Sequence, residues 1–148
     1  MQYQENPENG RILALDLGRK RIGLALSDPL GISAQGLPTL QRTTIREDIA
    51  AIEALAREKG ATLVLLGHPL NMRGDEGRQA AYTREFAEKL QERTGLAVRF
   101  WDERLTSKEA ERVLKQSGIS IEKRAQAVDR LAAVILLSSF LDSGATAA

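Results

Sequence analysis

Acidic side chains at three widely separated places in the sequence could meet in the fold and act together. Asp16 stands at the end of a short apolar run, and Glu103 follows another such run. Asp129 lies in the last apolar-periodic segment. A carboxylate at a strand end is held by a rigid backbone yet still reaches solvent. If the two runs are neighbouring strands and the last segment is a helix crossing their ends, the three carboxylates converge.

Such a cluster would need a cation. Carboxylates placed so near one another repel, and without a cation at least one would have to take up a proton. The chain has no cysteine and one histidine, so oxygen ligands favour Mg²⁺ or Mn²⁺ over zinc. Two such ions ~3.5–4 Å apart can activate a water and stabilise the leaving oxygen of a phosphodiester. Taken singly, each acid is more readily explained as a turn former, a solvated surface charge or the partner of a nearby arginine. Their joint placement is what predicts a hydrolase.

Cationic and amide side chains accompany the acids and are candidates for holding a nucleic-acid backbone. Three basic residues follow Asp16 at a hairpin tip, and one follows Glu103. The loop expected from Gly67 to Gly77 adds one amide and one more basic residue, and it leads into a helix N-terminus, which attracts anions. Its sequence does not match a P-loop. The candidate nucleic-acid-binding residues are Arg19, Lys20, Arg21, Asn71, Arg73 and Arg104.

Length and composition set limits on this hypothesis. The 148 residues are 43% hydrophobic and 28% charged, which is typical of a folded protein. We expect one domain over residues 11–142, with flexible tails at 1–10 and 143–148. The net charge of +1 means that nucleic acid would bind to a local patch and not to a polycation. The polar N-terminus lacks a signal-peptide core, so we expect a cytoplasmic protein without a membrane anchor.

The apolar periodicity predicts a strand and helix order that could position the acids. The final helix shows an inward stripe at Val128, Ala132, Ile135 and Ser139, with Asp129 at its edge. Thr44 and Glu47 fit a capping box at the start of the first helix, and Gly60 fits its end. We expect strands near 11–17, 21–27, 37–40, 61–66 and 96–101, and helices near 44–60, 75–93, 106–116 and 121–141.

Two strands joined in a hairpin and then strands alternating with helices predict a mixed sheet. The first strands would pair antiparallel, and the later ones parallel through right-handed crossovers. The fold class is therefore α/β, a five-stranded mixed sheet with helices on both faces. That description fits the ribonuclease H-like architecture, and it also fits several unrelated α/β folds.

Four motifs, spread over about residues 11–141, stand out together. They are Asp16-Leu-Gly18 with Arg21-Ile-Gly23-Leu-Ala25, Gly67-His-Pro69-Leu-Asn71-Met-Arg-Gly74, Asp102-Glu103-Arg104-Leu-Thr106-Ser107, and Asp129 with Ala132-Ala133. In combination they resemble the YqgF family, whose members are described as Holliday-junction-resolvase-like proteins and as pre-16S ribosomal RNA nucleases.

The resemblance implies a ribonuclease H-like fold and a metal-dependent nuclease that trims the 5′ end of pre-16S rRNA. Asp16, Glu103 and Asp129 match the family's catalytic, metal-binding acids, with Asp102 as a reserve for the middle one. The implied partners are pre-ribosomal RNA and the ribosome. Two residues depart from the family pattern: His68 stands where an apolar residue is expected, and Arg73 where an acid or amide is expected. Neither removes a ligand. A packing role for His68 is favoured over general-base catalysis.

Two alternatives remain open at the level of sequence. The same acids would serve a Holliday-junction-type DNA resolvase, which would have to be a dimer in order to cut symmetric strands. A non-catalytic RNA- or ribosome-binding protein with a vestigial site would keep the basic residues and bind no metal. The sequence does not fix the oligomeric state. Sugar kinases and actin-like ATPases share the Asp-x-Gly start, but they need two such domains.

Overall fold

The computed structural model of the chain describes residues 10–68, 77–102 and 121–144, although not the side chains of 121–126, 128 and 129. Its elements are β1 (Arg11–Leu17), β2 (Arg21–Ser27), β3 (Ala34–Gln41), α1 (Ile45–Lys59), β4 (Ala61–His68), α2 (Arg78–Thr94), β5 (Ala97–Asp102) and α4 (Ile121–Asp142). The helix expected at 106–116 lies outside the described residues. The other expected elements are all present.

The strands form one five-stranded sheet in the order β3-β2-β1-β4-β5. Strand β1 pairs antiparallel with β2 and parallel with β4, and β4 pairs parallel with β5. The predicted mixed sheet is therefore confirmed. Because β1, β4 and β5 run in the same direction, their carboxyl ends lie at one edge of the sheet, which we call the C-terminal edge.

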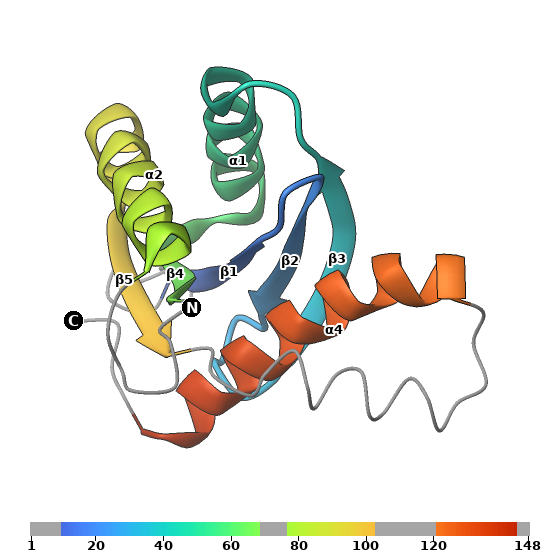
Figure 1. The fold of residues 1–148 in the computed structure, drawn as a ribbon. Helices are drawn as coiled ribbons and strands as arrows, with labels where there is room; N and C mark the ends of the chain where they lie inside the picture. Colours follow the sequence, from blue (N-terminus) through green and yellow to red (C-terminus); the bar gives the residue numbers. More distant parts are fainter. Residues whose placement is uncertain (1–9, 69–76, 103–120, 145–148) are drawn as a thin grey trace.

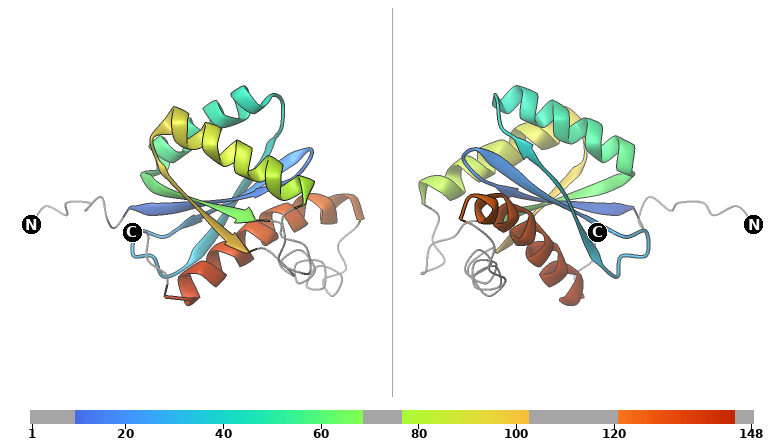
Figure 2. Two further views of the ribbon diagram at one scale, coloured as in Figure 1. Left: turned by 60° about the vertical axis from the view of Figure 1, so that its left-hand side comes forward. Right: turned by 90° about the vertical axis from the view of Figure 1, so that its right-hand side faces the viewer.

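Helices cover both faces of the sheet. Figures 1 and 2 show α1 and α2 side by side over one face, while α4 crosses the other face diagonally. Side chains alternate along β1. Leu13 and Leu15 therefore pack in the core under α1 and α2. Ile12 and Ala14 pack in the core under α4 with Ala133.

The first helix begins and ends as its sequence predicts. The side chain of Thr44 accepts a hydrogen bond from the backbone N–H of Glu47. Gly60 ends the helix with φ 71°, a left-handed conformation that favours glycine. None of the helices in the described ranges is both long enough and apolar enough to cross a bilayer.

Strand β3 is an edge strand and is longer than the 37–40 segment expected for it. The exposed Pro38 lies within it, and its register against β2 shifts between Ile22 and Leu24. Gly36 lies against α4, where an added Cβ would come within 2.8 Å of Arg130 Cγ. The glycine therefore allows the helix to approach the sheet closely.

The expected inward stripe of α4 was right at Ala132 and wrong at Ile135 and Ser139. Ile135 is half-buried and Ser139 is exposed, whereas the buried residues are Ala132, Ala133, Leu136, Leu137 and Phe140. The physical reason is that every residue from 131 to 137 is apolar. The hydrophobic pattern therefore cannot indicate which side of the helix faces the core there.

The full burial of Ala133 indicates that α4 packs closely on the sheet. Replacing Ala133 with Leu should lower the free energy of unfolding by about 1–3 kcal/mol, since an inserted side chain would overpack the core under α4. Ala54→Leu, at an exposed position on α1, should change it by less than about 0.5 kcal/mol. Urea denaturation of both variants measures the difference. Equal effects would contradict close docking of α4.

Candidate active site at the C-terminal edge of the sheet

Asp16 lies at the C-terminal edge, one residue before the end of β1. Its Cα is paired with that of Gly23 on β2, and the side chain is half-buried. By strand alternation position 16 belongs with Ile12 and Ala14, on the side of the sheet that α4 covers. The acid is thus held on a central strand and reaches the surface where that strand ends.

The helix that carries Asp129 lies on that same side of the sheet. The next residue, Arg130, donates from Nε to the carbonyl oxygen of Leu37 on β3 at 3.1 Å, which anchors this turn of α4. Position 129 comes four residues before the buried Ala133 and seven before the buried Leu136, so the helical repeat places it on the sheet-facing side. The side chain of Asp129 is outside the described residues.

Asp102, the other described acid at this edge, lies on the opposite side of the sheet from Asp16. Trp101 packs edge-on against Phe140 of α4, with ring centroids 5.1 Å apart, and its indole N–H donates to Ser139 Oγ at 3.1 Å. Asp102 comes next in β5, so alternation places it on the opposite side from α4. Asp102 is therefore on the other side of the sheet from Asp16. Four sequence candidates, Glu103, Arg104, Asn71 and Arg73, lie outside the described residues.

His68 is a packing residue at the end of β4, as its sequence position suggested. Its ring lies 4.9 Å from that of Phe100, and its Cα is paired with that of Asp102. Burial lowers the pKa of His68 below 6.5, and the charge of Arg84 lowers it further, while Asp102 opposes the change. The imidazole is therefore neutral at pH 7.

The basic hairpin tip follows Asp16 directly. Gly18 donates its N–H to the carbonyl oxygen of Arg21 at 2.9 Å, which closes the turn. A Cβ on Gly18 would lie 2.6 Å from that same oxygen, so only glycine fits. Arg19 and Lys20 are exposed at the tip, and Arg21 is half-buried.

Arg42, which the sequence did not single out, fixes the position of this tip. Its Nε donates to Asp48 Oδ2 at 3.1 Å, one NH₂ group donates to the Gly18 carbonyl at 2.9 Å, and the other donates to the Tyr82 hydroxyl. Asp48 Oδ1 also accepts from the backbone N–H of Thr43. The guanidinium therefore joins the β1–β2 turn to α1 and α2.

The Arg42–Asp48 pair is buried, since the two side chains are 11% and 2% exposed. Burial alone would lower the pKa of Arg42, but the hydrogen bonds to Tyr82 and Asp48 outweigh it, so the pKa is raised. A signal for this pair exists in the sequence. Asp48 interrupts the apolar stripe formed by Ile45, Ile49 and Ile52, and a buried acid needs a cationic partner.

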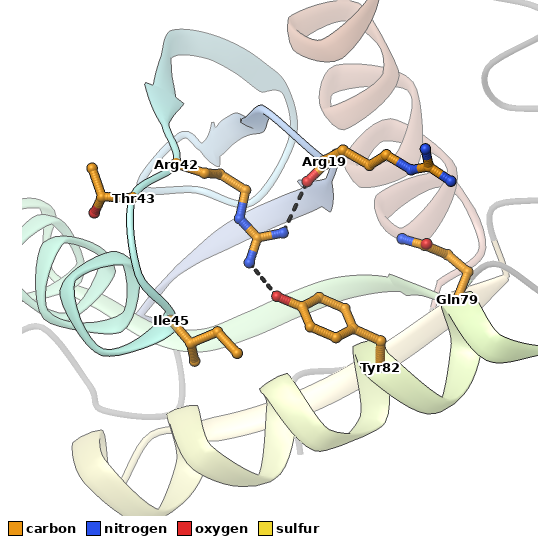
Figure 3. A pocket seen from close by; sticks show the side chains of 7 residues that line it. Arg19, Arg42, Thr43, Ile45, Gln79 and Tyr82 are labelled. Carbon is orange, nitrogen blue, oxygen red and sulfur yellow. Dashed lines mark hydrogen bonds between the residues drawn. The ribbon is translucent and has the colours of Figure 1, made fainter.

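A pocket of about 390 Å³ opens beside Arg42, and we call it the hairpin pocket. It lies between the β1–β2 turn and the first turns of α1 and α2 (Figure 3). Its lining residues are Gly18, Arg19, Arg42, Thr43, Ile45, Gln79 and Tyr82.

The described residues contain no group of three acidic or histidine side chains placed to hold a metal. Two of the three expected ligands, Glu103 and the side chain of Asp129, fall outside those residues. The donor set itself, carboxylate oxygens with no thiolate in the chain, fits a hard divalent cation.

Comparison with known proteins identifies the family. The sequence profile of RuvX, described as Holliday junction resolvase, matches residues 10–143. The chain belongs to the RuvX family. A protein of Koribacter versatilis is 50% identical over 134 residues, which are 90% of this chain and 88% of that protein. One from Syntrophomonas wolfei is 48% identical, covering 90% and 95%. Both carry the name "Putative pre-16S rRNA nuclease". The resemblance to the YqgF family is thereby confirmed.

A solved structure supports the fold of this RuvX-family chain. Thermus thermophilus RuvC, in complex with a Holliday junction substrate, superimposes with a TM-score of 0.53 at 14% identity. The match covers 93% of this chain and 98% of RuvC. The ribonuclease H-like fold expected from the sequence is confirmed.

The buried ion pair predicts a large effect of one substitution. Asp48→Ala should lower the free energy of unfolding by about 3–5 kcal/mol, because it leaves the Arg42 charge buried without its counter-ion. Glu53→Ala, in the same helix, removes partly exposed ion pairs with Arg57 and Arg93 and should cost less than about 1 kcal/mol. Chemical denaturation tests both. Similar losses would show that the pair is not an internal brace.

The lowered pKa of His68 predicts a pH-dependent stability. The unfolded chain takes up a proton on His68 near pH 6.5, whereas the folded chain resists it until lower pH. The free energy of unfolding should therefore fall as pH drops below about 6.5. In EDTA, wild type should lose more stability between about pH 7.5 and about pH 5.5 than His68→Asn, which cannot titrate. Identical pH profiles of the two proteins would refute the effect.

Proposed function

We propose that this RuvX-family chain is a metal-dependent nuclease that hydrolyses phosphodiester bonds of structured RNA, with pre-16S ribosomal RNA as its substrate and the cytoplasm as its place of action. One observation carries the proposal. Asp16 ends the central strand on the same side of the sheet as the helix bearing Asp129. The names of the curated relatives supply the substrate.

Asp16, Glu103 and Asp129 are proposed as the metal-binding acids. The alternation along β5 supports Glu103 over Asp102, because Trp101 faces α4 and Asp102 therefore does not. If β5 continued for one more residue, position 103 would fall on the same side of the sheet as Asp16. Mg²⁺ or Mn²⁺ held there would lower the pKa of a water and stabilise the leaving oxygen. The acids themselves would supply the carboxylate oxygens, and the strand would keep the oxygens of Asp16 in a fixed position.

The basic residues of the C-terminal edge would hold the RNA backbone. Arg19, Lys20 and Arg21 sit on a turn that Arg42 braces, so their charges stay beside Asp16. We assign Asn71, Arg73 and Arg104 to the same role on the basis of their sequence positions. Contacts of this kind supply affinity without reading sequence, which suits a substrate recognised by its shape.

A DNA resolvase is the second candidate, and the family description together with the RuvC-like fold favours it. It would act through the same acids. The substrate separates the two hypotheses, since a resolvase prefers a four-way DNA junction and a ribosomal RNA nuclease prefers the precursor leader.

The decisive experiment compares hydrolysis of a pre-16S 5′ leader and of a four-way DNA junction, with Mg²⁺ or Mn²⁺ and with EDTA. Asp16→Asn should lower the rate at least about 100-fold, because a neutral amide is a far weaker ligand than a carboxylate. Asp142→Asn, at the exposed end of α4, is the matched control and should leave the rate unchanged. Undiminished cleavage by Asp16→Asn would eliminate the proposed chemistry.

The same experiment separates the remaining alternatives. Faster cleavage of the junction would assign the chain as a resolvase. RNA binding with no cleavage and no uptake of divalent metal would leave a binding protein with a vestigial site.

A further inference from the structure

The hairpin pocket lies on the other side of the β1–β2 turn from the proposed acids. Asp16 belongs to the side of the sheet that α4 covers, whereas the pocket opens beside α1 and α2. The two share the turn itself, because Gly18 lines the pocket and is two residues from Asp16. The Cα atoms of Asp16 and Gly18 can therefore be at most ~7 Å apart.

Arg42 presents hydrogen-bond donors to this pocket in a fixed orientation. A guanidinium has five N–H groups, and its bonds to Asp48, Gly18 and Tyr82 use three of them. The guanidinium also lies 5.4 Å from the centre of the Tyr82 ring and 5.7 Å from that of Phe86. A group held from so many directions loses little conformational entropy when a ligand binds.

The surrounding side chains add donors and an apolar wall. The Tyr82 hydroxyl accepts from Arg42, so its own proton is available to donate. Figure 3 shows Arg19 and Gln79 together at one end of the pocket, and Ile45 near Tyr82. Among the described residues that line the pocket there is no acid, and the nearby Asp48 is paired with Arg42.

The pocket thus carries the net positive charge of Arg19, since Arg42 is paired with Asp48, and it is rich in donors and larger than a phosphate needs. Its volume of about 390 Å³ falls in the range of small-molecule sites. A phosphate bound to Arg42 and Arg19 would leave room for a sugar and base against Ile45. We propose that the hairpin pocket binds one unpaired nucleotide of the substrate strand, next to the cleaved bond; this inference rests on the proposed nuclease function.

The nucleotide must be unpaired because of the path that the strand takes. A strand that passes Asp16 and enters the pocket has to bend around the tip at Arg19 and Lys20. A duplex is stiff over ~150 base pairs and cannot make that turn, whereas a single strand can. Through this pocket the chain recognises the boundary between paired and unpaired RNA.

Binding is tested apart from cleavage. Asp16→Asn in EDTA is titrated calorimetrically with a nucleoside 5′-monophosphate and, separately, with inorganic phosphate. The nucleotide should bind more tightly than phosphate. Adding Tyr82→Phe or Gln79→Ala should weaken nucleotide binding by about 3–10-fold each, as expected for one lost hydrogen bond. Gln91→Ala, exposed farther along the same helix, is the control and should have no effect.

Cleavage gives the second readout. Wild type should cut a hairpin RNA with unpaired nucleotides beside the scissile bond at a lower KM than a blunt duplex. Tyr82→Phe and Gln79→Ala should each raise KM for the first substrate at least about 3-fold more than KM for the duplex, because only the first substrate has an unpaired nucleotide to place in the pocket. Gln91→Ala should change neither KM.

The outcomes distinguish the two hypotheses. Nucleotide binding without any nuclease activity would overturn the proposed function and keep the pocket. Metal-dependent cleavage with no nucleotide binding, or with phosphate bound as tightly as the nucleotide, would overturn the pocket and keep the nuclease.

Discussion

Backbone pairing along both edges of β1 is the constraint on which the rest of the structure depends. With β2 on one side and β4 on the other, and with helices over both faces, the strand can carry a charge only where it ends. Asp16 occupies that point. The strand also determines what can cover it, since Ala14 and Ala133 leave room for α4 to lie close. The helix lies close to β1 because the side chains between them, Ala14 and Ala133, are small.

The second support of the edge is the Arg42 brace. A hairpin tip that carries three basic residues would repel itself and move freely if nothing held it. Arg42 binds the carbonyl of Gly18 at the base of the tip and is itself held by Asp48 and Tyr82. The resulting turn is rigid on the side of α1 and α2, and its exposed charges face the solvent. Positioning and charge are thus supplied by different residues.

Much of the fold could be predicted from the sequence because its signals are local. The capping residues Thr44 and Gly60 mark helix ends by their own hydrogen bonds and backbone angles. The phase of α4 could not be predicted, because residues 131–137 in its middle are all apolar and so show no polar face to orient the helix. Strand β3 was underestimated, since Gly36 and Pro38 resemble a loop until the pairing with β2 is known. Arg42 escaped notice because two of its partners, Gly18 and Tyr82, are distant in the sequence, although the nearby Asp48 marks the position of a buried acid.

The outer edge of β3 has a consequence for how molecules meet. An edge strand offers its free N–H and C=O groups to any other strand that comes near. Pro38 has no N–H to offer, and the register shift between Ile22 and Leu24 distorts the line of the strand. Both features disfavour pairing of a second copy along this border into a continuous sheet.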